Sequence, residues 1–107
     1  MEHVDVHTAH AAGEDAVLVD VREQDEWAAG RAPGATHVPL SAFGAATWDP
    51  EVRYLFVCRS GARSGQAAMA LSRAGYRAAN VEGGMLAWAA ADLPMEADDG
   101  EPHVLSH

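Results

Sequence analysis

Two nearly continuous apolar runs, each with a single charged residue, constrain the fold of this chain more than any other feature of its sequence. Residues 16–21 (AVLVDV) and 53–58 (RYLFVC) are rich in β-branched and aromatic side chains and do not alternate between apolar and polar residues. Short continuous runs of this kind are typical of strands buried on both faces, as in a parallel sheet. Directly after the second run, apolar residues recur at helical spacing over 63–76. The sequence therefore predicts an α/β fold.

The remaining segments continue this alternation. We expect short strands over 3–6, 35–40 and 77–84, short helices over 8–13, 22–30 and 85–91, and a helical turn over 41–48 with Ser41 as its N-cap. Strands that alternate with helices form parallel sheets covered on both faces. We expect one domain over residues 1–107, with a core of about 3–94 and a mobile acidic tail over 95–107.

The charge balance argues against several classes of partner. The chain carries 16 acidic residues and 7 arginines, with no lysine, which gives a net charge of −9. Nucleic acids and anionic membranes both need a basic face, so we expect neither as a partner. No apolar run reaches the roughly 18 residues that span a bilayer, and the sequence shows no export signal. We expect a cytoplasmic protein.

The single cysteine, Cys58, lies where chemistry is expected in such a fold. In open α/β sheets, ligands bind beyond the carboxyl ends of the strands, and Asp20, Arg22 and Cys58 all fall at such ends. One cysteine cannot form a disulfide within the chain. The thiol is therefore either a buried, inert core residue or a nucleophile.

The segment after the cysteine favours the nucleophile. Residues 59–64 (RSGARS) contribute two arginines and two hydroxyl groups just before the predicted helix. Backbone amides at a helix start have no helical partner and can converge on an anion, and Gly61 lets the loop curl tightly. Arginines at a helix N-terminus oppose the helix dipole, so helix stability alone does not explain them. We expect a cup of donors that binds an anion and stabilises the thiolate.

With these residues in place, the chain resembles the rhodanese-like (sulfurtransferase) domain family, as a single-domain member. Three blocks carry the resemblance, which covers about residues 3–94. They are VDVREQDEWAAGRAPGATHVPL at 19–40, CRSGARS at 58–64 and VEGGMLAW at 81–88. Three blocks in the family's order are more specific than a cysteine motif alone.

The resemblance implies a five-stranded parallel sheet flanked by helices on both faces, and a catalytic Cys58 that cycles through a persulfide. The implied substrate-binding residues are those of the loop: Arg59, Ser60, Gly61, Ala62, Arg63 and Ser64. Asp20 and Arg22 match positions that brace the fold near the site, and Trp27 and Trp88 match core positions. We expect no cofactor and no metal ion.

The implied activity is transfer of a sulfane sulfur from a small anionic donor such as thiosulfate to a thiophilic acceptor. The acceptor, which is cyanide, a thiol or another protein, must be external because the chain has no second cysteine. We expect a monomer or a weak dimer. Two other roles for such a domain stay open: a non-catalytic binding module, and a sulfur-relay module whose donor is the persulfide of a partner protein.

A cysteine-dependent phosphatase or an arsenate reductase is the rival from another enzyme class. Its loop places the arginine after five intervening residues, which from Cys58 is position 64, a serine. The arginine stands at 63, so the loop is one residue shorter. We expect its cup to be too small for a tetrahedral phosphate or arsenate and better suited to one additional sulfur atom.

The histidines near the amino terminus are the only candidate metal ligands that the spacing suggests. His3, His7 and His10 would share one face of a continuous helix. The predicted strand over 3–6 interrupts that helix, so we expect these side chains to lie on the surface.

Overall fold

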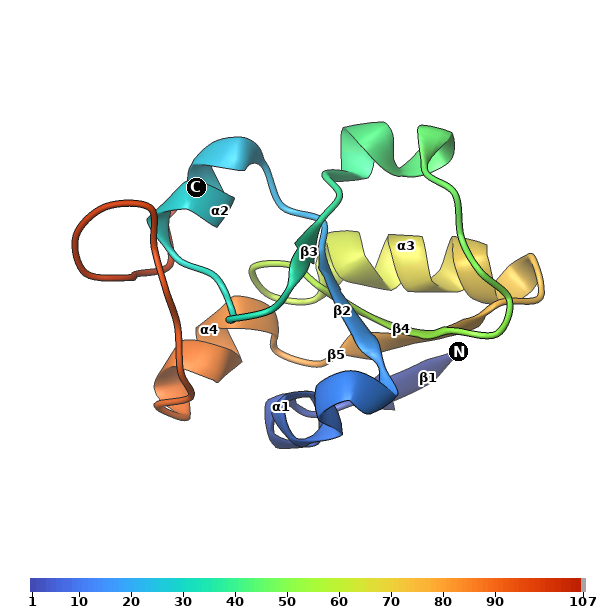
Figure 1. Ribbon diagram of the computed structural model, residues 1–107, viewed down its shortest axis with the longest axis horizontal. Helices are drawn as coiled ribbons and strands as arrows, with labels where there is room; N and C mark the ends of the chain where they lie inside the picture. Colours follow the sequence, from blue (N-terminus) through green and yellow to red (C-terminus); the bar gives the residue numbers. More distant parts are fainter. Residues whose placement is uncertain (107) are drawn as a thin grey trace.

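The computed structural model describes residues 1–106, which form a five-stranded parallel sheet flanked by helices (Figure 1). The strand order is β1-β5-β4-β2-β3. The strands are β1 (Glu2–Val4), β2 (Val17–Asp20), β3 (Thr36–His37), β4 (Arg53–Val57) and β5 (Arg77–Val81). The helices are α1 (Val6–Ala12), α2 (Gln24–Ala29), α3 (Ala62–Arg73) and α4 (Gly84–Ala90), with 3₁₀ turns η1 (Gly13–Asp15) and η2 (Leu40–Ala45). The predicted fold class is confirmed.

The central strand β4 is buried on both faces. Leu55 and Val57 pack into a core with residues of α1 and α4. Tyr54, Phe56 and Cys58 pack into a second core, on the opposite face, with residues of α3 and η2. Because side chains of a strand alternate between the two faces, a strand with a core on each side needs apolar residues at every position. This explains the unbroken apolar run, and it directs the cysteine toward α3.

The edge strand β3 is shorter than the sequence suggests, and the turn after it starts differently. Only Thr36 and His37 form the strand, which pairs with β2. Pro39, which cannot donate to a ladder, immediately precedes η2. The expectation that Ser41 caps this turn is wrong, because Ser41 lies inside η2, is exposed and makes no capping bond.

The carboxyl-terminal segment, which its composition predicts to be a mobile tail, makes backbone hydrogen bonds to α2 and to Arg31. The backbone amides of Asp98 and His103 donate to the carbonyl oxygens of the last two residues of α2, each at 3.0 Å. Glu96 and Arg31 exchange two backbone hydrogen bonds, both of 2.9 Å. A Cβ on Gly30 would collide with the backbone of His103, so the segment crosses α2 where only a glycine leaves room. Backbone bonds of this kind leave no signature in composition.

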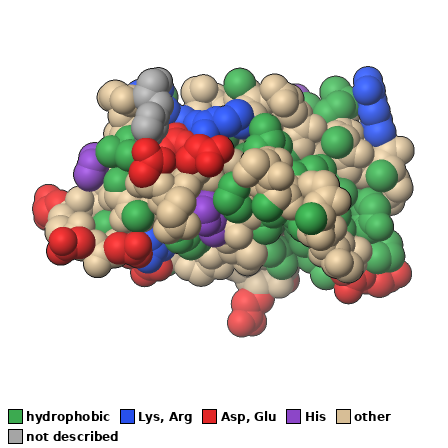
Figure 2. Space-filling view, turned by 90° about the horizontal axis from the view of Figure 1, so that it is seen from above, with side chains coloured by type: hydrophobic (Ala, Val, Ile, Leu, Met, Phe, Trp, Pro, Cys, Tyr) green, Lys and Arg blue, Asp and Glu red, His purple; other side chains and the backbone are tan. Residues whose placement is uncertain are grey.

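Some charged side chains on the surface form ion pairs with side chains of opposite charge. Arg53 pairs with Glu2 at 2.8 Å and Arg31 pairs with Asp98 at 2.9 Å; in each pair the arginine is partly buried and the acidic side chain is exposed. Figure 2 shows acidic and basic side chains in contact on one part of the visible face and hydrophobic side chains gathered on another part. This face therefore offers no continuous basic patch. Within residues 1–106, no helix is long and apolar enough to cross a bilayer.

Candidate functional site

Three polar segments meet at one edge of the sheet, where β2, β4 and β5 end side by side. The parallel register pairs Asp20 of β2 with Val57 of β4, the residue just before Cys58. In β5, Asn80 pairs with Phe56 of the same strand β4. Cys58 is only 1 % exposed. The strand ends therefore bring Cys58, Asp20 and Asn80 to the same edge. The topology predicted this place for Asp20 and Cys58.

The sulfur of Cys58 is surrounded by hydrogen-bond donors. The backbone amide of Gly61 lies 3.1 Å from Sγ and the hydroxyl oxygen of Ser64 lies 3.2 Å from it. Burial by itself would raise the pKa of Cys58, but hydrogen bonds from the Ser64 hydroxyl and from the amides of Ser64, Gly61 and Ser60 together outweigh it. The pKa of Cys58 is therefore lowered, and the site favours the thiolate.

Helix α4 explains why the loop presents its amides rather than its carbonyl groups to the sulfur. The carbonyl oxygens of Cys58 and Arg59 accept hydrogen bonds from the amides of Met85 (2.8 Å) and Leu86 (3.0 Å), in the first turn of α4. With its carbonyl groups held there, the loop turns its N–H groups the other way. A Cβ on Gly84 would collide with both carbonyl oxygens, so the close approach of α4 requires glycine.

Asn80 belongs to the site, although the sequence reasoning gave it no role. Its Oδ1 lies 2.6 Å from the hydroxyl oxygen of Ser64, and its Nδ2 lies 3.3 Å from the carbonyl oxygen of Gly61. Asn80 is 5 % exposed. The signal in the sequence was one amide in the otherwise apolar run 78–81, because a buried amide needs partners.

The two loop arginines are both engaged, in different ways. Arg63 makes two hydrogen bonds to the carboxylate of Glu26, with Nη1–Oε1 at 2.7 Å and Nη2–Oε2 at 2.9 Å. The hydrogen bonds from Arg63 lower the pKa of the nearly buried Glu26 to about 2, so this pair remains ionised. The Nε of Arg59 donates to the carbonyl oxygen of Leu105, at 2.8 Å. The cup around Cys58 is thus built from backbone amides and one hydroxyl, and the guanidinium groups lie outside it.

The remaining loop residues differ in exposure. Ser60 and Ala62 are exposed, Gly61 is half-buried and Ser64 is fully buried. Gly61 has a φ of 113°, in the left-handed region that favours glycine, immediately before α3 begins. The loop predicted as the substrate-binding segment therefore forms one tight turn around Sγ, with Ser60 and Ala62 open to solvent.

Asp20 and Arg22 form a buried pair beneath the site. Arg22 donates from Nη2 to Asp20 Oδ2 at 2.6 Å and to the carbonyl oxygen of Gly30 at 2.7 Å, and both charged side chains are fully buried. His37 donates from Nε2 to the carbonyl oxygen of Arg22 at 2.8 Å. These contacts tie the end of β2 to the end of α2 and to β3, which agrees with a bracing role.

The two tryptophans expected in the core differ. Trp88 is 2 % exposed and donates from Nε1 to the carbonyl oxygen of Pro94 at 2.8 Å. Trp27 is only half-buried and stacks on the ring of His37, with centroids 4.7 Å apart. The guanidinium carbon of Arg31 also lies over the ring of Trp27, 4.8 Å from its centroid. Trp27 therefore lies at the surface, stacked with His37 and Arg31, and only part of its ring is buried.

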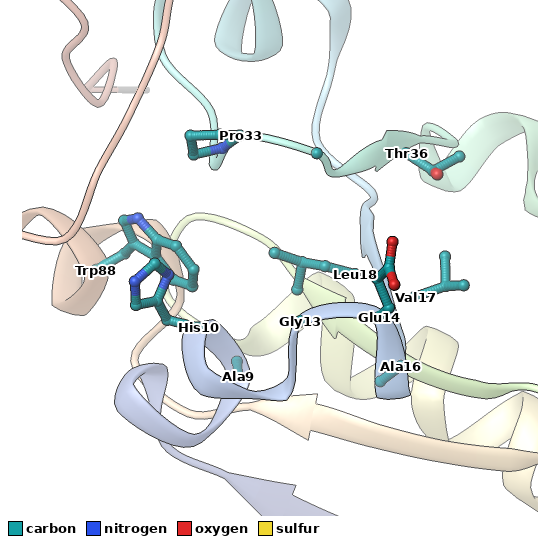
Figure 3. A pocket seen from close by; sticks show the side chains of 11 residues that line it. Ala9, His10, Gly13, Glu14, Ala16, Val17, Leu18, Pro33, Thr36 and Trp88 are labelled. Carbon is teal, nitrogen blue, oxygen red and sulfur yellow. The ribbon is translucent and has the colours of Figure 1, made fainter.

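A cleft of about 610 Å³ lies away from the cysteine loop. Figure 3 shows His10 and Trp88 on one of its sides, Leu18 at its centre and Pro33 and Thr36 opposite. None of residues 58–64 lines it. Among the described residues 1–106, no three His, Cys, Asp or Glu side chains are arranged to hold a metal ion.

The chain belongs to the rhodanese-like domain family, because the family model described as "Rhodanese-like domain" matches residues 4–91. A crystal structure of a rhodanese-related protein from Thermoplasma volcanium superposes with a TM-score of 0.85, at 23% identity, over 90% of this chain and 98% of that one. At this identity the likeness concerns the fold.

Two relatives carry names that describe an activity. A protein of Allochromatium vinosum named "Sulfurtransferase" is 41% identical over 90 residues, which are 81% of this chain and 84% of the relative. "Thiosulfate sulfurtransferase GlpE" of Actinobacillus succinogenes is 36% identical over 90 residues, or 81% of each chain. The chain thus matches most of the length of both relatives.

Proposed function

We propose that this protein is a sulfurtransferase that moves a sulfane sulfur from thiosulfate to cyanide or to an external thiol, through a persulfide on Cys58. The observation that carries the proposal is the ring of donors around Sγ, namely the amides of Ser60, Gly61 and Ser64 and the hydroxyl of Ser64. Such a ring stabilises a thiolate before reaction and a persulfide anion after it. The names of the two relatives support the same activity.

In the first step, the Cys58 thiolate attacks the outer sulfur of thiosulfate. A bond forms between Sγ and that sulfur, the bond to the sulfonate sulfur breaks, and its electron pair leaves with sulfite. The exposed part of residues 59–64 binds the donor, and the loop amides then hold the terminal sulfur. The net charge of −9 does not prevent an anion from entering, because distant exposed charges are screened beyond about 8–10 Å.

In the second step, the acceptor attacks the terminal sulfur of the persulfide. With cyanide, a carbon–sulfur bond forms, the sulfur–sulfur bond breaks, and its electron pair returns to Sγ, which regenerates the thiolate and releases thiocyanate. The acceptor comes from outside because the chain has a single cysteine. The reaction is covalent, two-step catalysis with one carrier atom.

The size of the loop argues against the rival phosphatase chemistry. Four residues separate Cys58 from Arg63, and the guanidinium of Arg63 is bonded to Glu26 by both of its terminal nitrogens. A phosphate ester needs that guanidinium for its equatorial oxygens, as bidentate recognition of phosphate requires. A single sulfur atom needs only the loop amides.

The test is the intact mass of the protein after incubation with thiosulfate. We expect Cys58 to gain the mass of one sulfur atom, and we expect cyanide to remove that mass with release of thiocyanate. The Cys58→Ser variant should gain nothing and turn over nothing. Thiocyanate formation by Cys58→Ser at the wild-type rate would remove Cys58 from the mechanism.

The outcomes also separate the other roles of such a domain. Loading by a small-molecule or protein persulfide, but not by thiosulfate, would assign the protein to sulfur relay. If Cys58 gains sulfur from none of these donors, the protein would be assigned to the class of non-catalytic binding modules. Efficient hydrolysis of an aryl phosphate by wild-type protein would overturn the argument from loop size.

A further inference from the structure

One hydrogen atom is shared between two acceptors at the base of the site. The hydroxyl of Ser64 lies 3.2 Å from Sγ of Cys58 and 2.6 Å from Oδ1 of Asn80. A serine hydroxyl has one hydrogen to donate, so it can serve only one of the two acceptors at a time. Ser64 is fully buried, so the two acceptors compete for this hydrogen within the protein interior.

The orientation of the Asn80 amide decides which of the two acceptors receives the hydroxyl hydrogen of Ser64. Its other end faces the carbonyl oxygen of Gly61, which only accepts hydrogen bonds, at 3.3 Å. The NH₂ group must therefore face Gly61, and the oxygen Oδ1 must face Ser64. At 2.6 Å, the contact between the two oxygens is at the short end of O–H···O hydrogen bonds. The resting thiol thus leaves the Ser64 hydrogen on Asn80.

Ionisation of Cys58 changes this balance. A thiolate is a stronger acceptor than a thiol and attracts the same hydrogen. If the hydrogen turns to Sγ, Oδ1 of Asn80 loses its hydrogen bond inside a buried site, at a cost in free energy. If it stays on Asn80, the thiolate lacks one of its donors. In both cases Asn80 opposes ionisation of the cysteine.

We propose that Asn80 is a positioning residue that holds the hydroxyl hydrogen of Ser64 away from the sulfur of Cys58 and so limits how readily the thiol ionises. This inference builds on the proposed role of Cys58 as the nucleophile. Its consequence lies in the balance between the two steps. A more acidic thiol leaves more easily when the acceptor takes the terminal sulfur, but it is a weaker nucleophile when it attacks the donor.

A change at Asn80 leaves the charged groups around Cys58 in place. Arg63 of α3 interacts with the thiolate charge and is paired with Glu26 of α2. The Asp20–Arg22 pair lies at the end of β2, and Arg59 adjoins the cysteine in the chain. Asn80 carries no charge, so its replacement by a neutral residue acts through hydrogen bonds and not through a new ionic contact.

The test replaces Asn80 by leucine, which keeps the branched shape and removes both polar atoms. The carbonyl oxygen of Gly61 keeps a partner, because it also accepts from the amide of Gly65 at 3.0 Å. We expect Asn80→Leu to lower the pKa of Cys58 by roughly one unit. The measurement is the pH dependence of iodoacetamide alkylation, which reads Cys58 alone because the chain has one cysteine.

A double-mutant cycle shows whether the effect runs through Ser64. In a Ser64→Ala background, we expect Asn80→Leu to leave the pKa of Cys58 nearly unchanged. A pKa that stays or rises in Asn80→Leu, or that falls equally in both backgrounds, would overturn the proposal. A purely structural role, in which the loop loosens, predicts such a rise. If Asn80→Leu does not unfold cooperatively, Asn80→Ala takes its place, with the same expected and contrary outcomes.

The readout distinguishes this inference from the proposed function. Alkylation measures ionisation of the thiol and requires no donor or acceptor of sulfur. The protein could therefore show the expected coupling and still fail to accept sulfur from thiosulfate. It could equally transfer sulfur with no coupling between Asn80 and Ser64.

Discussion

Arg63 and Glu26 join two distant parts of the sequence by a pair of hydrogen bonds, 2.7 Å and 2.9 Å long. Arg63 lies in the first turn of α3, directly after the cysteine loop, and Glu26 lies in α2. Oε1 of Glu26 also accepts from the amide of Glu23 at 3.0 Å, which closes the capping box of α2. One carboxylate therefore both starts a helix and fixes the loop arginine, and the buried Glu26 depends on Arg63 for its countercharge.

Arg63→Ala should destabilise the fold, because the buried Glu26 loses its countercharge. Glu26 is 2 % exposed and would keep a charge without its partner. We expect the free energy of unfolding to fall by about 2–3 kcal/mol, less than for a fully buried pair because Arg63 is partly exposed. Denaturant titration measures this loss. Adding Glu26→Gln should restore part of it, and the control Arg53→Ala, whose partner Glu2 is exposed, should cost below about 1 kcal/mol.

Acid should remove the contribution of Glu26 to stability. The carboxyl has a pKa of about 2 in the folded chain against 4.5 as its ordinary value, so the unfolded chain binds the proton first as the pH falls. The stabilisation is complete above about pH 4.5 and is lost progressively toward pH 2, by roughly 2–3 kcal/mol once solvent screening of the partly exposed Arg63 is allowed for. Unfolding free energies measured over this range should show a weaker pH dependence in Glu26→Gln. The exposed control Glu96→Gln should behave as wild type.

The sequence predicted those features of the fold and site that follow from one segment at a time. The unbroken apolar run 54–57 indicated a strand with a core on both faces, and the structure places β4 there. The glycine and the unpartnered amides after Cys58 indicated a turn that donates to the sulfur, and Gly61 does so. In both cases the backbone geometry of a single element decides the outcome.

The features that sequence reasoning missed are contacts between elements. Asn80 reaches Ser64 from a neighbouring strand, and Glu26 reaches Arg63 from another helix. The type and position of each side chain could be read from the sequence, but the residues around it did not predict which partner it contacts. The arginines were expected to offer their charge to an anion, and the structure shows Arg63 already committed to a carboxylate.

Gly84→Ala should distort the cysteine loop. A Cβ at this position would meet the carbonyl oxygens of Cys58 and Arg59, whereas a Cβ on Gly13 would meet no atom within 4 Å. Both glycines have similar positive φ angles, 57° and 54°. Gly13 has a ψ of −124°, so Gly13→Ala reports the cost of a strained positive-φ backbone without a collision, about 1–3 kcal/mol. We expect Gly84→Ala to cost at least about 1 kcal/mol more and to slow alkylation of Cys58. Equal losses in the two variants would mean that α4 does not hold the loop.

Gly30→Ala should release the carboxyl-terminal segment from α2. The φ of Gly30 is 176°, which is extended backbone open to any residue, so the effect comes from collisions of the new Cβ with the backbone of His103 and the side-chain end of Met95. In wild-type protein, the amides of Asp98 and His103 are hydrogen-bonded and should exchange slowly with solvent. Gly30→Ala should speed both by about tenfold or more, and the control Gly44→Ala, with open space around its Cβ, should not. Rapid exchange at both amides in wild-type protein would instead support the mobile tail that composition alone suggests.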